Sequence, residues 1–281
     1  MHDFLMPLND WLITNNIDPL NLTLYINDIP DQSIGNFVPI AQRLFGITIK
    51  QVPEHEFNQL DLETLKLRAY LSGPFPRHTF SNIQTTIQNR LELGGNRGRH
   101  KIILIERGGR QHSEEDSIKL GDRTTTTGAL RRQIANHDEV AGALKARYGR
   151  HFINVVLEDI DFEEQVRLFH HAHLIVALHG AGLNNMIWMG SNDGVVLEVG
   201  PHRKSPVFKN MSRSKGLRYF KIGRTINWNR YKPNESEDYV LDINKFNRRL
   251  DRIEREDKKL SAFRSKKHRL ATALHRLLKR L

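Results

Sequence analysis

The chain has 281 residues, of which 38% are hydrophobic and 27% are charged, a composition typical of one large or two modest globular domains. It contains no cysteine, which excludes disulfides, thiol catalysis and cysteine-ligated zinc. No apolar run approaches the roughly 20 residues that span a bilayer, and the N-terminus lacks the pattern of a signal peptide. These features lead us to expect a soluble, cytoplasmic protein.

The net charge of +11 is concentrated at the C-terminal end of the chain. Residues 245–281 contain 14 Lys and Arg against 4 Asp and Glu, whereas the residues before them are nearly neutral. A basic tail is usually a solvated helix, and less often it contacts an anionic membrane surface or nucleic acid. The apolar series from Phe246 predicts one long helix. It is too interrupted by charges for a coiled coil, so we expect the helix to pack on the body.

The first 95 residues alternate between helix-like and strand-like segments. The pattern predicts helices at 7–15, 37–45 and 80–93, and strands at 22–26, 47–52 and 65–71. Residues 94–99 contain three glycines among polar residues and form the best linker candidate.

After this linker the alternation continues more strongly. The pattern predicts strands at 101–105, 152–157, 174–178 and 194–199, and helices at 129–148, 162–171 and 182–189. Residues 108–128 are polar and are expected to be a disordered segment or a mobile loop at an active site. Strands that alternate with helices predict an α/β fold with a parallel sheet covered on both faces.

The most informative segment is His179-Gly180-Ala181-Gly182, followed by Leu183 and Asn184, between a predicted buried strand and a predicted helix. Such a turn presents backbone N–H groups at a helix N-terminus, and glycines let the backbone approach a phosphate closely. In open parallel sheets, ligands bind at this end of the strands. Taken alone, the motif fits an ordinary tight turn equally well.

The surroundings of the motif resemble glycosyltransferase family 61. A helix with Glu164-Gln165, a strand, the HGAGL sequence and a strand ending in Glu198 follow one another as they do in that family. Residues 103–107 are similar to its "yisR" element, and residues 131–140 to "R-x-I-x-N-E-x-E", with His137 where the family often has Glu.

The resemblance implies a GT-B arrangement of two Rossmann-like domains facing a cleft. Residues 1–95 would form the acceptor side, residues 96–230 would hold the nucleotide sugar, and residues 231–281 would be a helical tail. The implied reaction is inverting transfer from a UDP-sugar, UDP-xylose first and UDP-GlcNAc second, to a hydroxyl of a glycan or glycoprotein acceptor. It would need no metal and no cofactor, and a bacterial or viral glycan pathway would suit such a chain.

Candidate site residues follow from the same comparison. Residues 2–8 resemble the family's acceptor region, so Asp3, or His2 beside it, is the candidate base for the acceptor hydroxyl. Without a metal, the charge of the leaving diphosphate requires cationic groups. Arg107 directly follows a predicted strand and is the first candidate, with Arg132 second. Asn136 and residues His179, Gly180, Ala181, Gly182, Leu183 and Asn184 would complete the donor site, and Glu198 would accept the ribose hydroxyls.

Other interpretations remain open at this point. Asp159-Ile-Asp161 could hold a divalent metal, but Asp161 with Glu164 also fits a capping box at the start of a helix, which we prefer. His170, His171 and His173 straddle a helix end, and we do not expect them to form a zinc site. At the level of function, the alternatives are a nucleic-acid-binding protein that uses the basic tail and a sugar-nucleotide binder without turnover. The body lacks a nucleic-acid reader motif, so no nucleic-acid partner is expected.

Overall fold

The computed structural model describes residues 5–27, 38–59, 76–93, 100–107, 118–120, 123–125, 133–190, 193–200, 206–223 and 239–278. Its helices are α1 (Leu5–Thr14), α3 (Val38–Phe45), α4 (Glu54–Phe57), α5 (Arg77–Arg90), α7 (His137–Tyr148), α8 (Phe162–His170), α9 (Val207–Lys215) and α10 (Ile243–Leu278). Its strands are β1 (Thr23–Asn27), β2 (Thr48–Val52), β3 (Lys101–Glu106), β4 (Ile118–Leu120), β5 (Arg123–Thr125), β6 (Phe152–Val156), β7 (Ala172–Leu178), β8 (Val195–Val199) and β9 (Arg218–Ile222). Short 3-10 helices are η1 (Pro19–Asn21), η3 (Gly149–His151), η4 (Leu157–Asp159) and η5 (Ala181–Trp188).

The centre of the molecule is a five-stranded sheet in the order β6-β3-β7-β8-β9, in which every pair of neighbours is parallel. The strands are rich in Val, Ile and Leu because helices cover both faces, and strand β8 is buried at every position. The predicted α/β class and the predicted parallel sheet are confirmed. Counted along the chain, the order is 2-1-3-4-5, the order of flavodoxin-like doubly wound folds.

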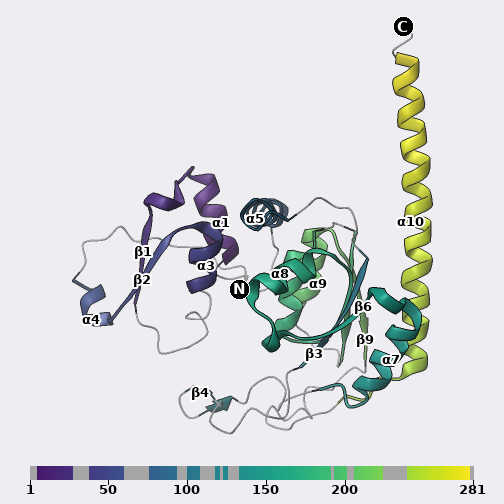
Figure 1. Cartoon of the computed structure of the whole chain (residues 1–281), viewed down its shortest axis with the longest axis horizontal. Helices are drawn as coiled ribbons and strands as arrows, with labels where there is room; N and C mark the ends of the chain where they lie inside the picture. Colours follow the sequence, from purple (N-terminus) through teal and green to yellow (C-terminus); the bar gives the residue numbers. More distant parts are fainter. Residues whose placement is uncertain are drawn as a thin grey trace.

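Successive side chains of the strands point to opposite faces of the sheet, and each face has its own core. Helices α7 and α10 cover one face, where Phe246, Leu250 and Ile253 of α10 are buried against the strands. Helix α8, the 3-10 helix η5 and helix α9 cover the other face (Figure 1). Because all five strands are parallel, their carboxyl ends lie at the same edge of the sheet.

The N-terminal elements join the core of the second face. Strands β1 and β2 form a parallel pair, and helix α1 packs on α5, which contacts α9 and η5. Buried residues from α1, α3 and α5 belong to the same apolar cluster as those of the central sheet. The described residues therefore show a two-stranded unit attached to the sheet, and a second Rossmann-like domain facing a cleft is not seen. The domain boundaries at 95 and 230 stay predictions.

Several predicted elements differ from the structure. Of the helix expected at 129–148, residues 129–132 lie outside the described residues, and the helix begins at His137, after Ile134 has paired with Tyr239 in an isolated parallel bridge. Within the polar segment 108–128, the described residues form an antiparallel hairpin of β4 and β5. The helix expected at 182–189 is the 3-10 helix η5. The strand predicted at 65–71 and the linker at 94–99 lie outside the described residues.

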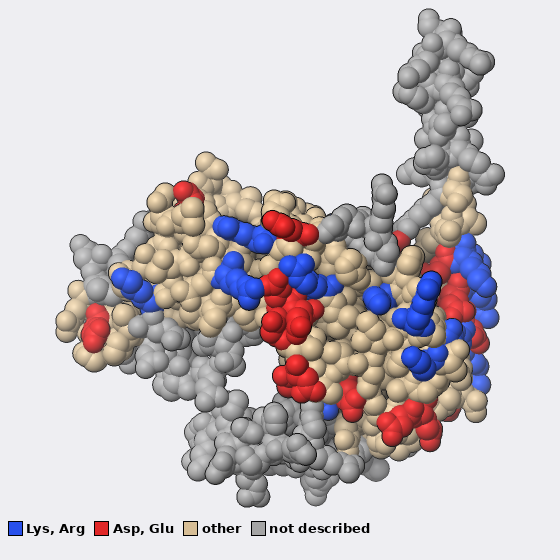
Figure 2. All heavy atoms as spheres, viewed as in Figure 1, with Lys and Arg blue, Asp and Glu red and all other residues tan. Residues whose placement is uncertain are grey.

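The tail contains the single helix α10, and the buried residues in the part of the helix whose side chains are described lie in its first turns. Phe246, Leu250 and Ile253 are at most 1% exposed, whereas Leu260 is 37% and Phe263 is 67% exposed. Basic and acidic side chains are mixed along the first turns of the helix (Figure 2). The helix contacts α7 and β9, on the face of the sheet opposite to α1 and α5. In the described part of the chain, no helix is long and apolar enough to cross a membrane.

Candidate functional site

Arg107 and His179 follow the two neighbouring strands at which the winding of the sheet reverses. From β3 the chain moves to β6 on one side, and it then returns to β7 on the other side of β3. At such a reversal the loops after the two central strands separate, which leaves a crevice that ligands occupy in open α/β sheets. The structure thus brings the predicted arginine and the predicted glycine-rich motif to the same switch point.

The two segments are in direct contact. Nη2 of Arg107 donates a 2.8 Å hydrogen bond to the carbonyl oxygen of His179. A methyl group added at Gly180 would overlap with Nη2 and lie 3.2 Å from Cζ of Arg107. The φ of Gly180 is 166°, an extended conformation that any residue adopts, so a larger residue here would be opposed by the Arg107 side chain and not by the backbone conformation. Gly180 therefore lets the guanidinium lie directly against the backbone of the motif.

Gly182 packs closely on the apolar side chains beneath the motif. A methyl group added there would lie 3.2 Å from Cδ1 of Leu157 and 3.4 Å from Cγ2 of Ile105. These side chains belong to the core beneath the motif. Gly182 therefore allows η5 to pack closely on the sheet. Its predicted role, to let the backbone approach a phosphate, stays a prediction.

Glu198 is the buried centre of a hydrogen-bonded cluster. The strand register places it directly opposite Lys221, with Tyr219 two residues earlier on the same face. Its Oε1 lies 3.0 Å from Nδ1 of His179 and 2.5 Å from Nζ of Lys221, and its Oε2 accepts a 2.6 Å hydrogen bond from Tyr219. The Glu198 side chain is only 2% exposed. Both oxygens are engaged by protein groups that hold the carboxylate in place, and its predicted contact with ribose stays a prediction.

The partners of Glu198 determine its protonation state. Burial raises the pKa of the Glu198 carboxyl, but the hydrogen bonds from His179, Lys221 and Tyr219 together outweigh burial and hold that pKa below its ordinary value. The Tyr219 hydroxyl has a raised pKa because it is buried and donates to this carboxylate. Glu198 is therefore ionised at neutral pH. An ionised carboxylate only accepts hydrogen bonds, so Nδ1 of His179 must carry a hydrogen.

The imidazole of His179 is fixed in orientation by two contacts. Glu198 holds Nδ1, and the ring of Phe208 packs edge-on at 5.1 Å between ring centroids. The His179 side chain is 13% exposed, which leaves part of its ring accessible to a ligand. Because Glu198 holds Nδ1, the other ring nitrogen of His179, Nε2, points in a fixed direction.

The rest of the motif is anchored in the core. Leu183 is fully buried, and its N–H donates to the carbonyl of Gly180. Ala181, which directly follows Gly180, is exposed. Among the described residues, the buried Oδ1 atoms of Asn184 and Asn185 have no hydrogen-bond partner. A buried polar atom without a partner is costly, so both amides are candidates to contact a ligand. Asn185, the asparagine of HGAGL-x-N, was not among the predicted site residues.

Comparison with known proteins identifies the family. The model of the family Glycosyltransferase 61 matches residues 1–196, more than two thirds of the chain. The chain belongs to glycosyltransferase family 61. It is also similar to the EGF domain-specific O-linked N-acetylglucosamine transferase of Gallus gallus, with 26% identity over 90 residues. That match covers 31% of this chain and 17% of the relative's length, so it relates one segment of the two proteins.

Three predicted site residues of this family 61 chain lie outside the described residues. They are the candidate bases Asp3 and His2 and the second candidate arginine, Arg132. Asn136 is described, and its amide group joins two segments of the chain. Its Nδ2 donates to the carbonyl of Leu241 at 2.9 Å, and its Oδ1 accepts from the N–H of the same residue at 2.9 Å. Asn136 thus fixes the chain that leads into α10, and its role at the donor stays a prediction.

The Asp159-Ile-Asp161 segment forms the predicted capping box. Oδ1 of Asp161 accepts from the N–H of Glu164 at 2.8 Å, and the Glu164 side chain accepts in return from the N–H of Asp161. His173 pairs with Asp257 of α10, whereas His170 is buried and its ring contacts that of His171. In the part of the chain that the structure describes, no three His, Asp or Glu side chains are grouped as metal ligands.

Sequence reasoning missed Tyr219 and Lys221. Both lie on β9, a strand that was not predicted from the sequence and that lies beyond the segment that matches the family model. One signal was available. Tyr219 and Lys221 alternate with the apolar Phe220 and Ile222, which predicts that they share one face of the sheet. A carboxylate on the neighbouring strand could then be expected beside them.

Proposed function

We propose that this family 61 enzyme binds a UDP-sugar at the switch point between β3 and β7 and transfers the sugar to a hydroxyl of a glycan or glycoprotein acceptor. The observation that carries the proposal is the contact between Arg107 and the His179–Gly180 backbone. This contact places a guanidinium at the carboxyl end of a parallel sheet. Beside it, the buried Oδ1 atoms of Asn184 and Asn185 have no hydrogen-bond partner among the described residues. A diphosphate needs this combination of a fork of donors and close backbone approach.

In the proposed reaction the acceptor hydroxyl attacks the anomeric carbon and inverts its configuration. A base takes the hydroxyl proton, the new C–O bond forms, and the bond from the sugar to the β-phosphate breaks, so that UDP leaves with the electron pair. Arg107 stabilises the negative charge that develops on the diphosphate. The Glu198 carboxylate keeps the His179 ring oriented toward the donor. Asp3, with His2 as the second candidate, is the proposed base.

For the donor we propose a UDP-sugar, and two sugars are candidates. The resemblance ranks UDP-xylose before UDP-GlcNAc, whereas the name of the Gallus gallus relative refers to N-acetylglucosamine and favours UDP-GlcNAc. No metal is included in the proposal, because Asp161 is engaged as a helix cap and Arg107 supplies a positive charge.

A thermal-shift panel of UDP-sugars, followed by assays for release of UDP, tests this proposal. A ligand that binds only the folded state raises its melting temperature. We expect UDP and at least one UDP-sugar to stabilise the protein and transfer to require an acceptor. Stabilisation by UDP-sugars without any turnover would favour the sugar-nucleotide binder. No stabilisation by any of them, together with salt-dependent nucleic-acid binding that needs only residues 245–281, would favour the second alternative.

Asp3→Asn is the corresponding test of the base. The substitution keeps the shape of the side chain and removes its ability to take a proton. We expect kcat to fall by about 10²–10⁴-fold, the usual contribution of general-base catalysis, with UDP affinity unchanged. Turnover of Asp3→Asn at the wild-type rate would overturn this assignment, and His2→Ala would then be measured.

A further inference from the structure

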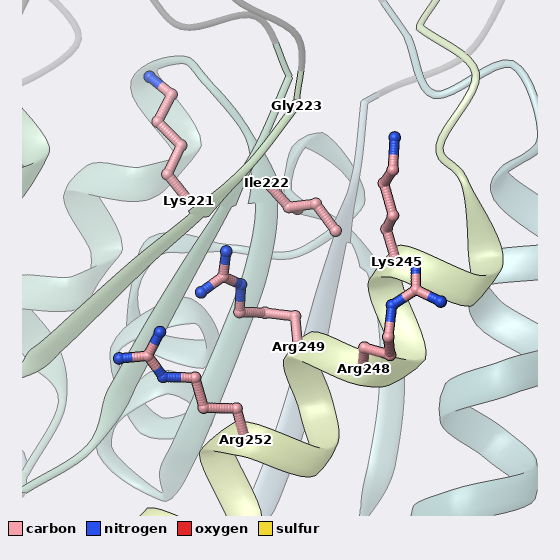
Figure 3. Close-up of a pocket in the computed structure, with 7 residues that line it drawn as sticks. All are labelled: Lys221, Ile222, Gly223, Lys245, Arg248, Arg249 and Arg252. Atoms are coloured by element: carbon pink, nitrogen blue, oxygen red, sulfur yellow. The ribbon is translucent and has the colours of Figure 1, made fainter.

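A pocket lies outside the switch point, between the end of β9 and the first turns of α10 (Figure 3). Its volume is about 290 Å³. It is lined by Lys221, Ile222, Gly223, Lys245, Arg248, Arg249 and Arg252. Five of these seven residues are cationic and none is acidic, which separates this pocket from a mixed, solvated helix surface.

The charge available in the pocket comes from α10. The amine of Lys221 pairs with Glu198 and points away from the arginines in Figure 3. Lys245 lies 3.6 Å from Asp242, an exposed contact one turn away, and Arg252 lies 3.0 Å from Glu256. Among the ion pairs of the described residues, none involves Arg248 or Arg249. These two guanidinium groups therefore carry charge that no described carboxylate neutralises.

Two other arginines that contact α10 form ion pairs with its carboxylates. Arg147 pairs with both Asp251 and Glu254 of α10, and Arg218 pairs with Asp257. Guanidinium groups that serve to hold α10 on the sheet are thus matched by carboxylates. Within the described residues, packing of α10 gives Arg248 and Arg249 no such carboxylate partner, and this difference leads us to consider a ligand.

Two of the arginines are positioned in advance by an aromatic ring. The guanidinium carbons of Arg249 and Arg252 lie 5.9 and 5.7 Å from the ring centroid of Phe220, within the range of a cation–π interaction. Figure 3 shows both side chains reaching from α10 toward β9. Stacking restrains the planar group while its N–H edges stay free to bind an oxyanion, so less entropy is lost when a ligand binds.

We propose that this pocket binds the phosphate or sulfate group of an anionic saccharide. Tetrahedral oxyanions match the fork of donors on arginine. The concave shape and small volume favour a single compact anionic group over the flat surface of a membrane. That the group is carried by a saccharide rests on the proposed function, whereas the binding of an oxyanion does not.

The direct test is titration of the full-length chain with glucose 6-phosphate and glucose 6-sulfate, with glucose as the uncharged probe. We expect the two esters to bind and glucose not to bind. The double variant Arg248→Gln with Arg249→Gln should weaken ester binding by about 10-fold or more. Arg255→Gln, an exposed arginine of α10 outside the pocket, is the matched control and should change affinity by less than about 2-fold. Equal losses in the two proteins would overturn the proposal, because they would indicate general attraction to a basic helix.

Two further measurements separate this pocket from the donor site and from lipid binding. Arg249→Lys keeps the charge but loses the planar fork, so its affinity should fall between those of wild type and the double variant. Arg107→Gln should retain ester binding while losing UDP binding, so that failure at either site is seen separately. Ester binding lost in Arg107→Gln but kept in the double variant would contradict the assignment. Binding to phosphatidylserine vesicles without binding to free esters would replace it with a membrane contact.

Discussion

Arg107 and His179 are 72 residues apart in sequence, yet Nη2 of Arg107 donates a 2.8 Å hydrogen bond to the carbonyl oxygen of His179. This bond joins the ends of β3 and β7 at the reversal of the sheet. It also holds a guanidinium against Gly180, where a donor diphosphate is proposed to bind. The first predictions follow from the space at Gly180 and from the buried carboxylate beside His179.

Gly180→Ala should weaken UDP binding by about 10-fold, because the added methyl group displaces the guanidinium of Arg107. The fold should survive with a loss below about 1 kcal/mol, since the neighbouring atoms are the flexible end of a side chain. Gly142→Ala is the matched control, because its methyl group meets nothing within 4 Å and lies inside α7. It should leave UDP affinity unchanged and raise stability by about 0.5–1 kcal/mol. Calorimetry and chemical denaturation measure the two quantities, and equal UDP affinity in both variants would contradict the geometry.

Glu198→Gln should destabilise the protein by about 3 kcal/mol at pH 7, because Lys221 and His179 lose a buried charged partner. The folded protein lowers the pKa of this carboxyl. Its contribution to stability is therefore present above the ordinary value of 4.5 and is lost as the pH falls through the lower folded value. Urea denaturation from pH 7 to pH 3 should show the difference between wild type and variant shrinking below about pH 4.5. A constant difference across this range would show that the charge of Glu198 is not the cause.

The sequence predicts β3, β6, β7 and β8 of the central sheet, because these strands carry the pattern themselves, whereas β9 was not predicted. Residues 101–105 and 174–178 are continuous apolar runs, as expected when both faces are buried, and the observed strands lie within two residues of the predicted ones. The capping box at Asp161 was predictable for a similar reason, since its partners are three residues apart.

The parts that were not predictable depend on contacts between distant segments. Ile134 is in a bridge with Tyr239 because the chain before α10 returns there, which no local pattern indicates. Gly180 and Gly182 look equivalent in sequence, yet one faces Arg107 and the other faces Ile105. The helix N-terminus expected at the motif is a 3-10 helix, whose large side chains are buried between the sheet and α5.

The proposal that the reaction needs no metal is tested at the two aspartates. Asp161→Ala should cost about 1 kcal/mol of stability through loss of the helix cap, and transfer should persist in excess EDTA. Asp159→Asn changes an exposed side chain and should be nearly silent in both assays. Loss of transfer in EDTA that Mn²⁺ restores would favour a metal site instead.

Removal of residues 262–281 should leave a folded, UDP-binding protein. The buried residues of α10 in the described part of the helix end at Ile253, and Phe263 is largely exposed. We expect the melting temperature to change by less than about 2 °C, which corresponds to under 1 kcal/mol in a chain of this size. The truncated protein should also lose any affinity for vesicles of anionic lipid. A large loss of melting temperature, or insolubility, would indicate that the distal helix belongs to the core.

The most direct test of the donor site is titration of UDP into the wild-type protein and into Arg107→Gln by isothermal calorimetry. Loss of one charge-assisted interaction with a phosphate should weaken binding by about 10–100-fold. Arg150→Gln is the control, because Arg150 is exposed and precedes β6 at the opposite, amino end of the strands. We predict that wild type and Arg150→Gln bind UDP equally and that Arg107→Gln binds it at least 10-fold more weakly. Equal UDP affinity in all three folded proteins would contradict the assignment of the donor site to the switch point between β3 and β7.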